Sequence, residues 1–206
     1  MDDRSGNGGL LSAITTEHFV LQSANGSTYA EASARSSLYV MALSSSLVAM
    51  GFLSARHDVF LLFAATVLPA IFLLGLFTVV RLVETSLESM HYLTGIARIR
   101  AYYRSLGPEA ARQFTAEDGR WPETSSPALR LGPALAFFGT TASMIAVTNN
   151  VVAGAGMALL VHSFWPAAPS AASVLVGVAI ASVLTAVFYA YQRWRFNDYE
   201  AAGQKF

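Results

Sequence analysis

The stretch VFLLFAATVLPAIFLLGLFTVV, residues 59–80, contains no charged side chain. Fifteen of its residues are Val, Ile, Leu or Phe, and each contributes about −0.3 to −0.6 kcal/mol at the centre of a membrane helix. About 20 helical residues cross the ~30 Å hydrocarbon core of a bilayer, so this stretch predicts a transmembrane helix. Pro69 lacks an amide hydrogen and should kink the helix, leaving the Ala65 carbonyl without its usual donor, which the Thr66 hydroxyl could partly replace.

Three further stretches lack Asp, Glu, Lys and Arg and are long enough to cross a bilayer. One is 36–55, and the other two are predicted over 133–163 and 170–191. Charged residues make up 13% of the chain and the mean hydropathy is +0.46, whereas soluble domains have about 25% charged residues. The sequence therefore predicts an all-α integral membrane protein with four transmembrane helices.

These helices are expected to form two hairpins, joined and flanked by polar segments. The predicted order is an N-terminal segment at 1–35, a hairpin at 36–80, a helix and loop at 81–130, a second hairpin at 131–192 and a tail at 193–206. Twelve of the thirteen basic residues lie in the three polar segments, and Arg56 alone lies in an opposite turn. The positive-inside rule then predicts a cell-membrane protein with both termini and the central segment in the cytoplasm.

The polar segments are predicted to be largely helical. Asn25, Gly26 and Ser27 should break the chain, and Thr28-x-x-Glu31 has the pattern of a capping box that starts the first long helix. The second long helix should continue from 58 into the cytoplasm and stop at Gly107–Pro108, because apolar residues recur at three- and four-residue steps. These residues are Val83, Leu87, Met90, Leu93, Ile96, Ile99, Tyr103 and Leu106.

Asn149 and Asn150 are the most conspicuous polar residues within a predicted span. Asn150 shares a helical stripe with small residues, namely Gly139, Ser143, Ala146 and Gly154. Such a stripe indicates either a packing seam, within the chain or between subunits, or a pore lining or ligand contact. Exposure to lipid is disfavoured because an unpaired amide in hydrocarbon costs on the order of several kcal/mol. The fourth helix carries a second ladder, typical of close helix packing: Ser173, Gly177, Ala181 and Thr185.

Four side chains lie on one face of the predicted cytoplasmic helix: Glu84, Glu88, His91 and Arg98. They could form a solvated face with local ion pairs, a subunit interface or a regulatory site. Glu88-x-x-His91 matches half of a carboxylate-bridged di-metal motif, and the chain has no second copy of it. We therefore treat these residues as candidates for a cytoplasmic interface, with no metal expected.

The remaining composition argues against several functions. Cysteine is absent and the formal net charge is zero, which excludes thiolate chemistry and gives no general attraction to nucleic acid. Nucleotide-binding and nucleophile-elbow motifs are absent, and no Asp or Glu lies inside a predicted span. An enzyme or a cofactor is therefore not expected. Arginine in place of lysine, together with abundant alanine, indicates a GC-rich bacterial genome.

Residues 14–53, ITTEHFVLQSANGSTYAEASARSSLYVMALSSSLVAMGFL, resemble an uncharacterised family of four-pass membrane proteins from actinobacteria, and GIARIRAYY at 95–103 is also similar. The likeness covers roughly the N-terminal half and is compositional. The predicted layout is also similar to SLATT-type and RipA-like membrane proteins, and SLATT domains are proposed to form pores in bacterial conflict systems. No residue can be carried over from either.

The sequence thus predicts a homo-oligomer in the lipid bilayer that acts as a pore-forming or membrane-perturbing effector or regulator. The alternative is a non-conducting scaffold that binds a protein partner through its cytoplasmic helices.

Overall fold

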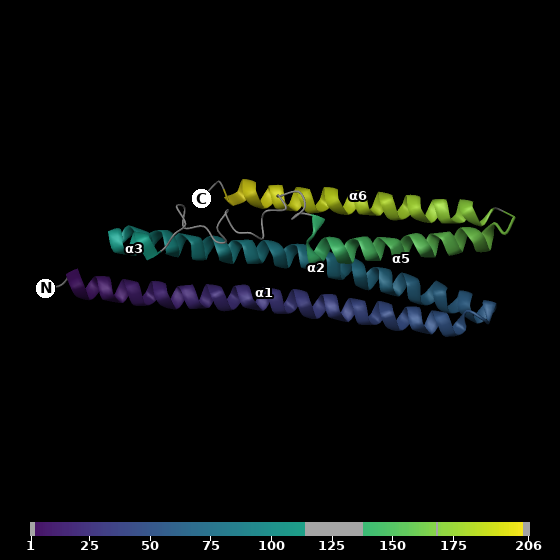
Figure 1. Cartoon of the computed structure of the whole chain (residues 1–206), viewed down its shortest axis with the longest axis horizontal. Coiled ribbons are helices and arrows are strands. Elements are labelled where there is room, and N and C mark those ends of the chain that lie inside the picture. The colour runs from purple at the N-terminus through teal and green to yellow at the C-terminus, as the bar shows by residue number, and fades with distance from the viewer. Residues whose placement is uncertain (1–2, 114–137, 168, 204–206) are drawn as a thin grey trace. The chain divides into compact units, whose positions relative to one another are not determined.

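The computed structural model describes residues 3–113, 138–167 and 169–203 (Figure 1). These residues form helices and short connections without any strand, and four of the helices are long and apolar enough to cross a membrane. The prediction of an all-α chain with four candidate spans is confirmed. The helices are α1 (Asp3–Leu53), α2 (His57–Ser105), α3 (Pro108–Gln113), α5 (Thr141–Phe164) and α6 (Ser170–Gly203).

Helix α1 is continuous through residues 25–27, so the predicted break there is wrong. The Ser27 hydroxyl donates to the Ala24 carbonyl at 2.7 Å, and the Thr28 hydroxyl donates to the Asn25 carbonyl at 2.7 Å. Both hydroxyls therefore bond back to the preceding turn instead of capping a new helix. A glycine inside a helix costs only about 1 kcal/mol, and the packing of α1 against α2 outweighs that cost.

Helix α2 comprises the 49 residues from His57 through Pro69 to Ser105, so the prediction that the second span continues as one helix is confirmed. The predicted kink at Pro69 stays a prediction. The Thr66 hydroxyl donates to the carbonyls of Leu62 at 3.2 Å and Phe63 at 2.9 Å. The prediction that it would serve the carbonyl of Ala65 is wrong. A helical threonine hydroxyl reaches the carbonyls three and four residues back, whereas the oxygen of the immediately preceding carbonyl points into the next turn and lies beyond its reach.

Helix α5 was predicted to start at about residue 133, whereas the structure begins it at Thr141. Residues 133–137 of the predicted helix lie outside the described residues. Thr140 is its N-cap, with φ −71° and ψ 154°, and its hydroxyl accepts a hydrogen bond from the Ser143 amide at 3.1 Å. A threonine in this conformation satisfies a donor that the first turn leaves free, so it fixes the start of the helix. Helix α6 continues past the predicted end of its span at 191.

The chain divides into two compact units. Unit 1 comprises Met1–Ala32 and Glu84–Pro133, and in it the first part of α1 contacts the second part of α2. Unit 2 comprises Ser33–Val83 and Ala134–Phe206, so it holds the rest of α1 and α2 together with α5 and α6. Within unit 2, α5 and α6 pack side by side (Figure 1).

Candidate functional site

Asn149 of α5 forms the centre of a buried polar cluster in unit 2. Its side chain is 3% exposed. Its Nδ2 donates to the carbonyl oxygen of Phe72 in α2 at 3.1 Å, and its Oδ1 accepts from the hydroxyl of Tyr39 in α1 at 3.2 Å. Tyr39 is fully buried. One amide therefore joins three helices, in an environment where a lost bond finds no water to replace it.

Gly75 of α2 makes the space for this cluster. A Cβ atom at this position would overlap the Asn149 carboxamide and would lie 2.7 Å from Cε2 of Tyr39. Neither Gly75 nor Tyr39 was among the residues singled out in the sequence. The available signals were a single glycine inside the most apolar span and a tyrosine inside a weaker one, and neither indicates a partner on another helix.

Asn150, the neighbouring residue, bonds in a different direction. Its side chain is 7% exposed, and its Nδ2 donates to the Thr185 hydroxyl of α6 at 3.1 Å. Thr185 in turn donates to the Ala181 carbonyl at 2.8 Å. Adjacent residues of a helix point about 100° apart, so the two asparagines connect α5 to different neighbours.

Further along the same pair, α5 and α6 come into backbone contact at Gly154 and Gly177. A Cβ atom on either glycine would overlap the carbonyl oxygen of the other. The Ala181 and Ala158 Cβ atoms complete the contact at 3.0 and 3.1 Å from those positions. Small residues permit this approach because no side chain separates the helices.

A third polar group closes the end of the pair near the start of α5. Gln192 of α6 is 1% exposed. Its Oε1 accepts from the Ser143 hydroxyl at 3.4 Å, its Nε2 donates to the Thr140 hydroxyl at 3.5 Å, and the two hydroxyls are 2.8 Å apart. Gln192 and Thr140 were not predicted as site residues. A glutamine at the edge of an uncharged run resembles an interfacial residue, and only its neighbours show that it is buried.

Most residues of the two predicted patterns, the stripe around Asn150 and the small-residue ladder of the fourth helix, are therefore buried within one chain. Those on the two helices are Ser143, Ala146, Asn149, Asn150 and Gly154 in α5 and Ser173, Gly177 and the half-buried Ala181 in α6. Gly139 is exposed and precedes the helix, so its placement on the stripe is wrong, for the reason that Thr140 caps α5. Whether several copies associate, and whether any of these residues lines a pore in such an assembly, stays a prediction.

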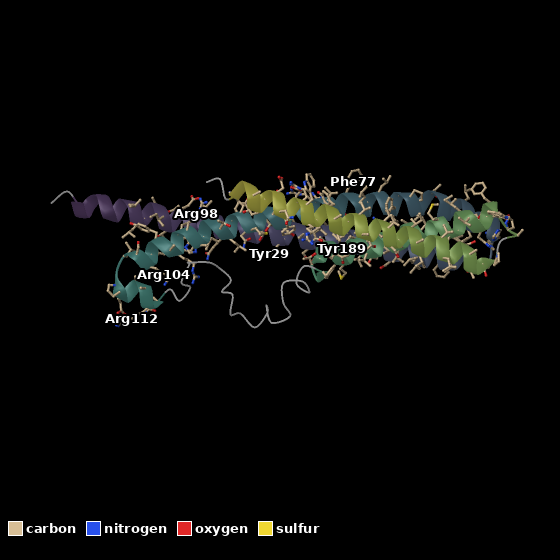
Figure 2. All side chains as sticks on the ribbon, turned by 90° about the horizontal axis from the view of Figure 1, so that it is seen from above. Tyr29, Phe77, Arg98, Arg104, Arg112 and Tyr189 are labelled. Atoms are coloured by element: carbon tan, nitrogen blue, oxygen red, sulfur yellow. The ribbon has the colours of Figure 1, made fainter. Side chains whose placement is uncertain are left out.

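The predicted cytoplasmic candidates lie on α2 in unit 1. Glu84 and Glu88 are half-buried, whereas His91 and Arg98 are exposed. Among the described residues, no group of three or more His, Asp or Glu side chains is placed to hold a metal ion. Arg98 lies with Arg104 and Arg112 toward one end of unit 1 (Figure 2).

Polar and aromatic contacts connect α1 and α2 within unit 1. The Ser89 hydroxyl donates to Oδ1 of Asn25 at 2.7 Å. Tyr103 stacks on His18 with ring centroids 6.4 Å apart, and its hydroxyl lies 3.3 Å from that of Thr15. Polar and aromatic side chains thus connect α1 and α2 at both ends of this pair.

The described residues thus form helices, four of which are long and apolar enough to cross a membrane, and buried side-chain amides form hydrogen bonds between them. No family model, curated protein or solved structure matches the chain. The contacts described above are therefore the basis for a functional proposal.

Proposed function

We propose that the protein is a four-pass membrane scaffold that does not conduct ions, with unit 1 in the cytoplasm as the surface that binds a protein partner. The proposal takes its orientation from the basic residues of the sequence. It has two parts, a sealed membrane region in unit 2 and a water-exposed binding surface in unit 1. Each part is supported by the distribution of polar and apolar side chains in that unit.

The observation that carries the proposal is that both asparagines of α5 are buried and bonded inside one chain. Asn149 bonds to α1 and α2, and Asn150 bonds to α6. A water-filled path needs polar groups that face it, whereas these amides are buried and each bonds to a neighbouring helix of the same chain. Large apolar side chains lie on the outward faces instead, including Val151, Leu175, Val183 and Phe77, the last of which points away from the helices in Figure 2.

Unit 1 supports the second part of the proposal. Phe19 is 66% exposed and Tyr29 is 62% exposed, and Val20 beside Phe19 is also exposed. In a lipid-facing helix such side chains need no explanation. In a segment placed in water they are typical of a protein-binding surface, where aromatic residues are enriched.

A pore-forming or membrane-perturbing assembly is the second candidate. What favours it is the concentration of small and hydroxyl-bearing residues along α5 and α6, which could line a path between copies. For Asn150 to take part in such a lining, its amide must leave Thr185 and face water.

An ion-flux assay on liposomes separates the two functions. We expect vesicles with the wild-type protein to be as tight as empty ones. A leak that disappears in Asn150→Leu and persists in Thr148→Val would instead establish the pore. Thr148→Val is the control because Thr148 lies on the same helix but is not one of the two asparagines that bond to other helices. The mass of the purified protein in detergent, measured in parallel, shows whether copies associate.

Partner binding is tested with the full-length protein. Affinity purification from cell membranes should recover a specific protein with the wild type, and the double variant Phe19→Ser/Tyr29→Ser should lose it. Gln22→Ser is the control because Gln22 is an exposed polar residue of the same helix. Equal recovery from all three proteins would contradict the scaffold proposal.

A further inference from the structure

An open groove of about 1020 Å³ runs along the α5–α6 pair of unit 2. Gly154 and Gly177 lie on its floor, and its lining includes the exposed Val151, Val174 and Val178. The two glycines bring the helix backbones into contact at this floor, and the small side chains of Ala155, Ala158 and Ala181 beside them leave the groove open. The lining is predominantly apolar, and it belongs to two helices that are long and apolar enough to cross a bilayer.

Ser173 places an unsatisfied hydrogen-bond donor in the lining of this groove. The residue lines the groove and is 3% exposed, and its hydroxyl has no hydrogen-bond partner among the described residues. Two threonine hydroxyls on these helices are satisfied by contrast: that of Thr185 bonds to Ala181 and that of Thr148 bonds to Met144. An unbonded hydroxyl away from water is costly, so an acceptor from outside the chain is expected. The hydroxyl can turn toward such an acceptor without moving the backbone.

The polar residues of the groove gather at one end. His162, Ser170 and Ser173 lie near the connection between α5 and α6, next to Trp165, which is exposed as tryptophans at a membrane interface are. Away from that end the lining is apolar except for Ser182 and Thr185, and the hydroxyl of Thr185 is already bonded. The groove therefore has a polar end at the interface and a long apolar stretch that leads into the membrane.

This polarity distinguishes between two possible occupants. A membrane helix from a second copy has its backbone carbonyls bonded internally and shielded by its own side chains, so it offers Ser173 only a second bond to a carbonyl that is already engaged. A glycerophospholipid has ester carbonyl oxygens below its headgroup and an acyl chain that continues inward. The lipid offers free acceptors at the level of the buried donor together with a chain that fits the apolar stretch, so it matches the groove better.

We propose that this groove is a binding site for one membrane glycerophospholipid. Its acyl chain lies over Gly154 and Gly177, an ester carbonyl oxygen accepts a hydrogen bond from Ser173, and His162 is placed near the phosphate. The proposal concerns unit 2 alone and does not depend on the partner-binding role of unit 1.

The test is lipid retention measured by native mass spectrometry. Protein from nanodiscs of equal parts phosphatidylglycerol and phosphatidylethanolamine is released into detergent, and the bound lipids per chain are counted as the detergent is exchanged. We expect one lipid to persist on the wild type. Ala155→Trp fills the groove and should weaken retention by roughly tenfold or more, whereas Ala179→Trp, on an exposed position outside it, should not. Ser173→Ala removes one hydrogen bond and should weaken retention roughly three- to tenfold.

Circular dichroism and thermal melting of each variant report whether it folds. If Ala155→Trp does not, Val178→Phe in the groove and Val176→Phe outside it replace that pair. Equal lipid retention by the groove and control variants would overturn the proposal, as would a wild type that loses all lipid at the first exchange. A groove variant that changes the mass of the assembly while keeping its lipid would identify a second copy as the occupant and overturn it as well.

Discussion

Glycine lies between packed helices in both units, but its contacts are different. In unit 2, Gly154 and Gly177 place the backbones of α5 and α6 against each other. In unit 1, Gly95 of α2 lies opposite the flexible end of Leu21 in α1, and a Cβ atom there would be 2.9 Å from Cδ1 of Leu21. A backbone cannot move aside, whereas a leucine can change rotamer. The same residue type should therefore differ greatly in its tolerance to substitution.

This difference in glycine contacts follows from the surroundings proposed for each unit, which are lipid for unit 2 and water for unit 1. Lipid chains are as apolar as leucine, so burial of apolar surface does not draw membrane helices together, and close backbone contact and interhelical hydrogen bonds must do so. In water, burial of side chains such as Leu87 and Ile96, both 6% exposed, supplies the association directly. The following substitutions test this comparison, from the largest expected effect to the smallest.

Gly177→Leu should have the largest effect. Its side chain must overlap the Gly154 carbonyl, so the helices can accommodate it only by separating, at a cost of ~3 kcal/mol or more. The measurement is the free energy of unfolding in mixed micelles, with Ala179→Leu as the exposed control on the same helix. Equal stability of the two variants would show that the glycine contact is not essential to unit 2.

Asn149→Leu should be next, because it removes two bonds at once. Interhelical hydrogen bonds in membranes average about 0.6 kcal/mol each, with a maximum of about 1.7. We expect a loss of ~1–2 kcal/mol in the free energy of unfolding. A double-mutant cycle with Tyr39→Phe isolates the bond between these two side chains. A coupling energy of zero would mean that Asn149 does not stabilise the contact with α1.

Asn150→Leu removes a single bond to Thr185 and should cost about half as much, ~0.5–1 kcal/mol. Thr185→Val removes the other partner, and the double variant should cost less than the sum of the two single losses. Fully additive losses in the unfolding experiment would place the two side chains outside each other's reach.

Gly95→Ala should have the smallest effect. Alanine favours the helix by about 1 kcal/mol over glycine, and the rotation of Leu21 offsets part of this gain, so the net change should lie within about 0.5 kcal/mol of zero. Amide hydrogen exchange of residues 84–105 measures it locally. A loss as large as that of Gly177→Leu would erase the distinction between the two units.

The sequence determined the parts of this protein that depend on local composition. The spans, the continuation of α2 beyond its apolar stretch and its end before Gly107 all follow from hydropathy, periodicity and helix-breaking residues along a single segment. The helix start at Thr140 was missed because an apolar run before it conceals the cap. The continuity of α1 through Gly26 was missed because local propensity favours a break that packing overrides.

Only the tertiary structure decided which faces meet. A periodic pattern shows that Ser143, Ala146 and Asn150 share one side of a helix, but it does not name the helix that covers that side. That Asn149 reaches Tyr39 and that Gly154 meets Gly177 depends on the packing of segments far apart in the chain. The free energy of those contacts belongs to pairs of helices, so no single stretch of sequence contains it.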